Sequence, residues 1–292
     1  MEPVNTNLIK HITEALPTYS RAFTQLAEFI LSKPFAVSSM SIEELAKAAD
    51  VSVATVNRFA HECGFNGYPL FRAELRAVFE KVFEPAEKLR MGALQNHAED
   101  EVVQASFDAL ASNIAQSKEW LAQKSVQPII EHLLNAERIF IIGMGVSALH
   151  ATFMTEILEP FLGPKVQELN NLGGPERAIR KISMLGANDV MIAISLPRYS
   201  KSILEMVHLA KAQQAYVVGI SDTPTAPLAG QTDVCLFASA EQPVLYASSA
   251  ALIALIEGLC AAVALQVKQS AERLAQQTES VLPYLYLPTD QP

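Results

Sequence analysis

The segment over residues 52–61 carries a row of short side chains that can form hydrogen bonds. On one side of a helix these would be Ser52, Ala54, Thr55, Asn57, Arg58 and His61. The apolar residues that recur at helical spacing, and that we expect to face a core, are Val53, Val56, Phe59 and Ala60. Short polar groups and arginine bind base edges and phosphates when a helix enters the major groove of DNA. The segment therefore predicts a recognition helix, although a helical hairpin with a solvated outer face would show the same spacing.

The residues just before this segment predict a partner helix. Ser41 is a favoured N-cap residue, and Glu44 three positions later can complete a capping box. Apolar residues follow at helical spacing, namely Ile42, Leu45, Ala46 and Ala49. Residues 50–51 interrupt the pattern before Ser52 caps the second helix, and Gly64 can end that helix in a left-handed conformation. Two short helices joined by a tight turn are typical of a helix-turn-helix.

A second group of polar residues follows predicted β-strands. One glycine-rich loop, Gly143-Met-Gly145-Val-Ser147, runs directly into a helix, and further hydroxyl groups lie in the loops over 195–200 and 221–223. In a parallel sheet, ligands bind beside the carboxyl ends of the strands. Helix-terminal amides and arginine both favour anions. We therefore expect a small anionic, hydroxyl-rich ligand at Gly145, Ser147, Ser195, Arg198 and Ser200. Simple helix capping by the serines, and an ion pair of Arg198 across an interface, remain alternatives.

No cofactor and no metal ion are expected. The Gly-x-Gly pair lacks the third glycine of the dinucleotide fingerprint, and no acidic residue ends the second strand. The histidines show no metal-ligand spacing. His150 and Glu156, on the helix after the glycine-rich loop, are the candidate acid or base of a sugar-phosphate isomerase. A lone histidine on such a helix is also typical of a structural role, so we assign no catalytic residue and do not expect an enzyme.

The net charge of −9 is unevenly distributed along the 292 residues. Residues 1–90 hold 10 basic and 11 acidic side chains, whereas residues 91–292 hold 12 and 20. The acidic excess can therefore face away from DNA phosphate. Because the first part has no strong basic stripe, one copy should bind nonspecific DNA weakly. We accordingly expect a homo-oligomer, a dimer or tetramer, that combines two half-sites.

Composition also predicts the compartment. No window approaches 18 uninterrupted apolar residues, so no membrane span is expected. The first residues lack the basic and apolar regions of a secretion signal. Cys63, Cys235 and Cys260 are too few and too scattered for a disulfide framework or a zinc cluster. These features predict a protein of the reducing cytoplasm.

The chain predicts two domains with a connecting segment. Helices are expected over residues 5–16, 19–32, 69–84, 101–122 and 126–135. Pro17 separates the first two, Pro34 ends the second, and the polar stretch over 85–100 is the best linker candidate. We expect a helix-turn-helix domain over 1–84, a linker and connecting helix over 85–124, and a ligand-sensing domain over 125–280.

Beyond residue 135, short apolar runs alternate with helical stretches. The predicted strands are Arg138–Ile142, Lys165–Leu169, Asp189–Ile194, Tyr216–Ile220 and Val234–Phe237. Helices are expected near 147–161, 174–185, 200–213 and 246–275. Continuously apolar strands separated by helices indicate a parallel sheet covered on both faces. The predicted fold class is an all-α domain followed by an α/β domain with a five-stranded parallel sheet.

From about residue 5 to residue 265 the sequence resembles the RpiR (MurR/RpiR) family of bacterial transcriptional regulators. The most specific residues are Ser41-Ile-Glu-Glu-Leu-Ala, Val51-Ser-Val-Ala-Thr-Val-Asn-Arg58-Phe and Gly64-Phe-Asn-Gly67-Tyr-Pro-Leu-Phe71-Arg72. Only the last position departs from the family pattern, with Arg72 where lysine is usual. The second half resembles the sugar isomerase (SIS) domain through Ile142-Gly143-Met-Gly145-Val-Ser147-Ala, Pro227-Leu228-Ala229 and Asp233.

The resemblance implies that a SIS domain senses a phosphosugar or related metabolite and thereby changes operator binding by the helix-turn-helix domain. The expected DNA contacts are Ser52, Ala54, Thr55, Asn57, Arg58, Tyr68 and Arg72. In the SIS loops, Ser147 and Ser195 match ligand-binding serines, and Ser200 stands where a threonine is usual. The middle of the second loop departs, because Pro197-Arg198-Tyr199 replaces a Ser-Gly type sequence. A sugar acid, or a phosphate bound by Arg198, is therefore an alternative to the usual phosphosugar.

Two other functions are compatible with the same two predicted domains. A SIS-type sugar-phosphate isomerase with an accessory helical domain would turn over its substrate through His150 or Glu156. An interaction protein would have both domains but would not bind DNA. An electrophoretic mobility shift with the DNA flanking the gene distinguishes these hypotheses.

Overall fold

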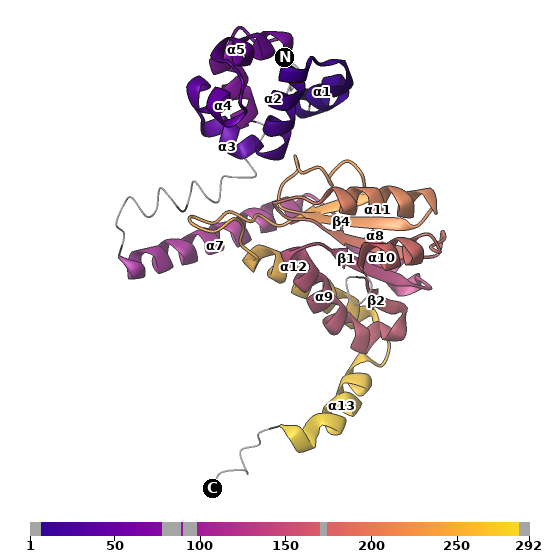
Figure 1. The fold of residues 1–292 in the computed structure, drawn as a ribbon. Coiled ribbons are helices and arrows are strands. Elements are labelled where there is room, and N and C mark those ends of the chain that lie inside the picture. Colours follow the sequence, from indigo (N-terminus) through magenta and orange to yellow (C-terminus); the bar gives the residue numbers. More distant parts are fainter. Residues whose placement is uncertain (1–6, 78–88, 90–97, 170–173, 286–292) are drawn as a thin grey trace. The chain divides into compact units, whose positions relative to one another are not determined.

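The structure, a computed structural model, describes residues 7–77, 89, 98–169 and 174–285 (Figure 1). The chain forms two compact units, Met1–Glu87 and Lys88–Pro292. The first contains the predicted helix-turn-helix and the second contains the predicted sheet.

The first unit is helical throughout its described residues. Its elements are α1 (Asn7–Ala15), the 3₁₀ turn η2 (Leu16–Thr18), α2 (Arg21–Ser32), α3 (Pro34–Ser39), α4 (Ile42–Ala48), α5 (Val53–Glu62) and a helix over 68–77. Phe59 of α5 is fully buried at the centre. Its ring makes edge-to-face contacts with Tyr19, Phe23 and Phe71 at centroid distances of 5.4, 5.3 and 6.1 Å. Such contacts stabilise a small core beyond the area they bury.

Helix α3 was not predicted from the sequence. Helix α2 ends before Pro34 as expected, but Pro34 then begins α3. Proline is tolerated in the first turn because its missing N–H has no partner within the helix there. The part of the predicted helix over 69–84 beyond residue 77, and most of the predicted linker over 85–100, lie outside the described residues.

The helix-turn-helix forms with the predicted caps. The Ser41 hydroxyl accepts the Glu44 N–H at 3.2 Å, and the Glu44 carboxylate accepts the Ser41 N–H at 2.7 Å, which completes the capping box. The Ser52 hydroxyl accepts the Thr55 N–H at 3.1 Å and so caps α5. Gly64 follows α5 with a φ of 88°, the left-handed conformation that favours glycine.

The second unit is built on the predicted five-stranded parallel sheet, in the order β2-β1-β3-β4-β5. The strands are β1 (Ile139–Gly143), β2 (Val166–Glu168), β3 (Val190–Ile194), β4 (Tyr216–Ser221) and β5 (Val234–Phe237). The chain leaves β1 toward β2 on one side and continues through β3, β4 and β5 on the other. The loops after β1 and β3 therefore meet at the point where the strand order reverses, which is where sheets of this kind bind ligands.

Helices cover both faces of the sheet (Figure 1). Ile141, Ile192 and Val218 pack with α8 (Gln127–Asn135), α9 (Val146–Leu162) and α12 (Ala250–Gln266). Residues of the opposite parity, such as Ile142 and Val217, pack with α10 (Gly174–Ile182) and α11 (Lys201–Ala212). Burial on both faces explains why the strands are continuously apolar.

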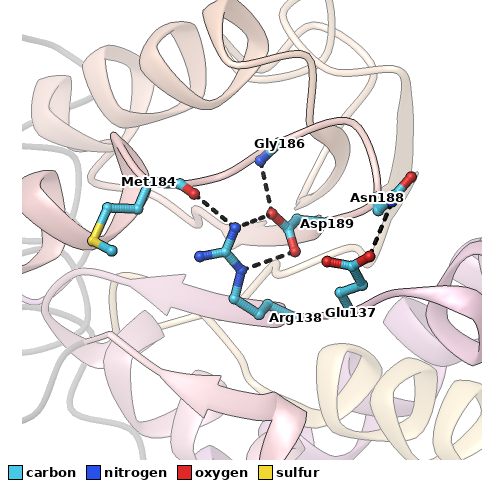
Figure 2. Close-up of polar contacts among 6 residues, drawn as sticks. All are labelled: Glu137, Arg138, Met184, Gly186, Asn188 and Asp189. Atoms are coloured by element: carbon cyan, nitrogen blue, oxygen red, sulfur yellow. Dashed lines mark hydrogen bonds and ion pairs between the residues drawn. The ribbon is translucent and has the colours of Figure 1, made fainter.

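The amino ends of β1 and β3 are joined by an ion pair (Figure 2). Arg138 Nε and Nη2 donate to the two carboxylate oxygens of Asp189 at 3.0 and 2.6 Å. Arg138 also donates to the Met184 carbonyl, and Asp189 accepts the Gly186 N–H. Beside them, Asn188 donates to the Glu137 carboxylate at 3.0 Å. This network lies at the opposite end of the strands from the predicted ligand loops.

The C-terminal helix predicted over 246–275 is two helices. Helix α12 ends at Gln266, and α13 (Ser270–Val281) follows after a bend of 110°. Gln269 has a left-handed φ of 63° at the break. The Ser270 hydroxyl donates to the Ala264 and Val267 carbonyls, which replaces helical hydrogen bonds lost there. Among the described helices none alone has the length and apolar character to cross a bilayer, and α12 with Ser270–Tyr284 meets that test only as a bent pair.

Candidate functional sites

The outward face of α5 differs from the predicted one at two positions. Ser52, Ala54, Arg58 and His61 are exposed, as expected. Thr55 is only 6% exposed, because its side chain lies on the inward side of α5, and its hydroxyl is 2.8 Å from the Ser52 hydroxyl. Val53, expected in the core, is 42% exposed. The buried stripe is thus Thr55, Val56, Phe59 and Ala60, which corrects the expected positions of both residues.

Tyr68 does not lie on a surface that DNA can reach, which corrects a second expectation. Its ring is 2% exposed, and its hydroxyl donates to the Val37 and Met40 carbonyls at 3.3 and 3.1 Å. Burial raises the pKa of Tyr68 to about 12. Arg72, partly buried, donates to the same Met40 carbonyl at 3.1 Å. Both side chains hold the helix over 68–77 to the end of α3.

Asn57 is half-buried and connects α5 to the turn that follows it. Its Oδ1 accepts the Tyr68 N–H at 3.1 Å. Gly67 has a φ of 96°, and a Cβ added there would lie 3.3 Å from Asn57 Oδ1. The glycine therefore provides both the conformation and the space for this hydrogen bond.

The second site lies at the carboxyl ends of β1 and β3. Gly143 ends β1, and a Cβ added there would lie 2.2 Å from the Ser147 carbonyl oxygen, so only glycine fits. Gly145 precedes α9 with a φ of 60°. The buried Ser147 hydroxyl accepts the Leu196 N–H at 3.3 Å and so joins the loops after β1 and β3.

These loops enclose a cavity of about 180 Å³. Its lining residues are Met144, Gly145, Val146, Ser147, Leu196, Pro197, Arg198, Tyr246, Ala247 and Ser249. The structure therefore brings three predicted residues together, Gly145, Ser147 and Arg198. The Arg198 guanidinium carbon lies 5.9 Å from the centroid of the Tyr246 ring, a cation–π distance. Tyr246 and its neighbours, which lie in the segment after β5, were not predicted, because ligand residues were sought only in the loops after the first, third and fourth strands.

The other two predicted residues do not line the cavity. Ser195 is buried, and its backbone pairs with β4, since its N–H donates to the Ile220 carbonyl and its carbonyl accepts the Ser221 hydroxyl. Ser200 precedes α11 without a side-chain capping bond. Between them, the Tyr199 hydroxyl donates to Asp222 at 2.8 Å, and burial together with this carboxylate raises the pKa of Tyr199. Tyr199 thus holds the Arg198 loop to the end of β4.

The isomerase candidates do not form an acid–base pair. His150 is buried and Glu156, on the same helix, is exposed. Burial lowers the pKa of His150, so its imidazole is neutral near pH 7. Within the described ranges no three histidine, cysteine or carboxylate side chains gather as a metal site.

Helix α7 (Glu99–Ala122) is attached to the segment that completes the cavity. Asn113, 2% exposed, donates to the Glu241 carbonyl at 2.7 Å and accepts from the Ser239 hydroxyl and the Glu241 N–H. The Ser117 hydroxyl accepts the Ser239 N–H at 2.8 Å. Residues 239–241 lead along the chain directly to Tyr246 and Ala247 in the cavity wall.

Comparison with known proteins finds one known domain in each of the two compact units. Residues 6–81 match the model of the helix-turn-helix domain of the rpiR family, and residues 132–265 match the SIS domain. The transcriptional regulator HexR of Pseudomonas aeruginosa is 30% identical over 238 residues, covering 79% of this chain and 78% of HexR. HexR of Escherichia coli is 25% identical over 239 residues, or 79% and 77% of the two chains.

Two solved structures share the fold. NanR of Vibrio vulnificus, complexed with ManNAc-6P, has a TM-score of 0.58 at 21% identity and covers 96% of this chain and 100% of its own. The sugar isomerase domain of an RpiR transcription factor from Sphaerobacter thermophilus has a TM-score of 0.54 at 23% identity. The match covers 61% of this chain and 97% of that one. Together the fold and the matches define a transcriptional regulator with a helix-turn-helix and a SIS domain. The chain belongs to the RpiR family of HTH-type transcriptional regulators.

Proposed function

We propose that this regulator binds operator DNA through α5 as a homo-oligomer, and that a small anionic sugar-type metabolite in the cavity beside Arg198 changes that binding. The observation that carries the sensing role is the convergence of Gly145, Ser147 and Arg198 on one cavity. A guanidinium beside helix-terminal amides favours phosphate or carboxylate. The wall of this cavity that contains Tyr246 offers an aromatic face to the rest of the ligand.

Both a phosphosugar and a sugar acid suit this chemistry. NanR of similar fold is complexed with ManNAc-6P, which supports a phosphosugar. The Pro197-Arg198-Tyr199 sequence supplies a charged side chain in the loop, which suits a carboxylate as well. We propose a DNA-binding domain over residues 1–84, a linker and connecting helix over 85–124 that includes α7, and a ligand-sensing domain over 125–280. We expect the protein to act in the cytoplasm, where operator DNA lies.

The effect of ligand binding would reach the DNA-binding domain through the residues that hold α7. A ligand that binds one conformation more tightly shifts the population toward it. Movement of Tyr246 would be carried by residues 239–241 to Asn113 on α7, and α7 leads along the chain to the helix-turn-helix domain.

A thermal-shift screen of sugar phosphates, sugar acids and keto acids tests the sensing role. We expect one class to stabilise the wild type and to have no effect on Arg198→Ala, while Arg180→Ala, exposed on α10, behaves as the wild type. A mobility shift with the DNA flanking the gene, with and without that compound, tests the regulatory role. Turnover of a sugar phosphate, abolished by His150→Ala, would instead support an isomerase.

A further inference from the structure

The first turn of α5 exposes an apolar side chain on an otherwise polar face. Val53 is 42% exposed, and it directly follows the cap residue Ser52. Thr55 and Val56 point into the core, so Val53 belongs to the same outward side as Ala54, Asn57 and Arg58. Residues in the first turns of a recognition helix are those that contact base edges. An exposed branched apolar side chain here has a natural partner in the C5-methyl group of thymine.

Asn57, one turn after Val53, presents a donor of fixed orientation. Its Oδ1 accepts the Tyr68 N–H at 3.1 Å, which only an oxygen can do, so the Nδ2 amide must occupy the other position. Residues at i and i+4 on a helix are neighbours on one face, with Cβ atoms about 5–6 Å apart. Val53 and Asn57 therefore form a pair with one apolar group and one hydrogen-bond donor.

We propose that this pair recognises a thymine in each operator half-site, with its C5-methyl group against Val53 and its O4 accepting from Asn57 Nδ2. The inference rests on the proposed binding of DNA by α5. Thymine is the base that offers both a methyl group and an acceptor in the major groove. Cytosine offers a donor, and guanine offers acceptors without a methyl group. The two-point contact of asparagine with adenine needs Oδ1 as well as Nδ2, and Oδ1 faces Tyr68.

The test begins with selection of binding sequences from a random duplex library by the full-length protein. Each thymine of the selected site is then replaced singly by deoxyuridine, which lacks only the methyl group. We expect the wild type to lose about fourfold in affinity at one position per half-site, the effect of about 0.8 kcal/mol for one buried carbon group. Val53→Ala should bind the parent site about fourfold more weakly and show no further loss at that position.

A second variant tests the donor. Asn57→Asp keeps an oxygen for the Tyr68 N–H but replaces the donor by an acceptor, so the selected base at that position should change from thymine to cytosine, whose N4 donates. Val103→Ala, the same substitution at a 51% exposed site on α7, should retain the wild-type uridine pattern. Should Val53→Ala melt at a lower temperature than the wild type, the affinities are compared at a temperature at which both proteins are fully folded.

Each outcome bears on a distinct claim. Equal losses by wild type and Val53→Ala at every uridine position would overturn the thymine contact while leaving DNA binding intact. An unchanged base preference in Asn57→Asp would overturn the hydrogen bond from Asn57 Nδ2 to thymine O4, again while leaving DNA binding intact. A library that yields no enriched sequence would overturn both the proposed DNA binding and this inference.

Discussion

The side-chain amide of Asn113 on α7 binds both backbone polar groups of Glu241, as a neighbouring strand would. Nδ2 donates to the carbonyl at 2.7 Å, and Oδ1 accepts the N–H at 3.2 Å. Oδ1 also accepts the Ser239 hydroxyl at 2.9 Å. One buried amide thus attaches α7 to the segment that continues into the cavity wall.

We expect Asn113→Ala to lower the free energy of unfolding by about 3 kcal/mol, because it leaves several buried polar groups without partners. Urea denaturation measures this change. In a DNA-binding assay, Asn113→Ala should also reduce the factor by which the stabilising compound changes affinity, with affinity in its absence unaltered. Asn135→Ala, exposed on α8, is the control and should change neither quantity. A normal ligand response in Asn113→Ala would contradict the proposed route.

Arg198→Lys separates charge from shape in the cavity. Lysine keeps the positive charge but loses the planar fork that binds phosphate or carboxylate at two points. We expect the effector to bind about tenfold more weakly to Arg198→Lys, a loss of about 1.4 kcal/mol, and not measurably to Arg198→Ala. Isothermal titration calorimetry measures both affinities. If Arg198→Lys and Arg198→Ala bind the effector as tightly as the wild type, the cavity is not the sensing site.

Asp189→Ala tests the ion pair in Figure 2. The Asp189 carboxylate is almost fully buried, whereas the Arg138 side chain is about a third exposed. Removal of the carboxylate leaves a partly buried guanidinium and the Gly186 N–H without their acceptor, so we expect a loss of about 2–3 kcal/mol, less than for a fully buried pair. Glu137→Ala, at an exposed neighbour, should cost within about 0.5 kcal/mol. Chemical denaturation distinguishes the two variants, and equal costs would refute the structural role of the pair.

Ser41→Ala removes the capping box of α4. Its hydroxyl accepts the Glu44 N–H, so we expect a loss of about 1 kcal/mol in the stability of the helix-turn-helix unit. Thermal unfolding followed by circular dichroism reports this loss. Ser39→Ala, exposed at the end of α3, should leave the melting temperature unchanged.

Stability should fall on acidification through His150. Burial lowers the pKa of His150 in the folded protein below the value of about 6.5 in the unfolded chain. Above pH 6.5 the imidazole is neutral in both states, so it has no effect on the pH dependence. As the pH falls below 6.5 the unfolded state binds the proton more readily, and stability is lost. Urea denaturation at pH 6.5 and at pH 5 measures this loss of stability, which His150→Gln should reduce.

The sequence predicted the elements well where local patterns determine them. Continuous apolar runs located all five strands, and the capping residues Ser41 and Ser52 located both helices of the helix-turn-helix. It failed where distant contacts decide. Tyr68 is buried because two carbonyls at the end of α3 accept its hydroxyl, and no local pattern reveals partners about thirty residues away.

The candidate sites likewise contain residues that local patterns predict and residues that only the folded chain brings into place. Gly145, Ser147 and Arg198 follow strands and were found by that rule, whereas Tyr246 reaches the cavity through the path of the segment after β5. The interchange of Val53 and Thr55 has a finer cause. Either residue fits the helical spacing of Val56, Phe59 and Ala60, and the packing of α5 in its core places Thr55 inward, where its hydroxyl bonds to that of Ser52.

The segment after β5 restricts how this regulator can be altered. Its first residues hold α7, and Tyr246 and Ala247 line the cavity a few positions later. Under the proposed function, a substitution that alters the ligand preference through these side chains would also alter the contacts that hold α7. The ligand preference and the effect of the ligand on DNA binding would therefore change together. An engineered biosensor based on this scaffold would have to be screened for both properties at once.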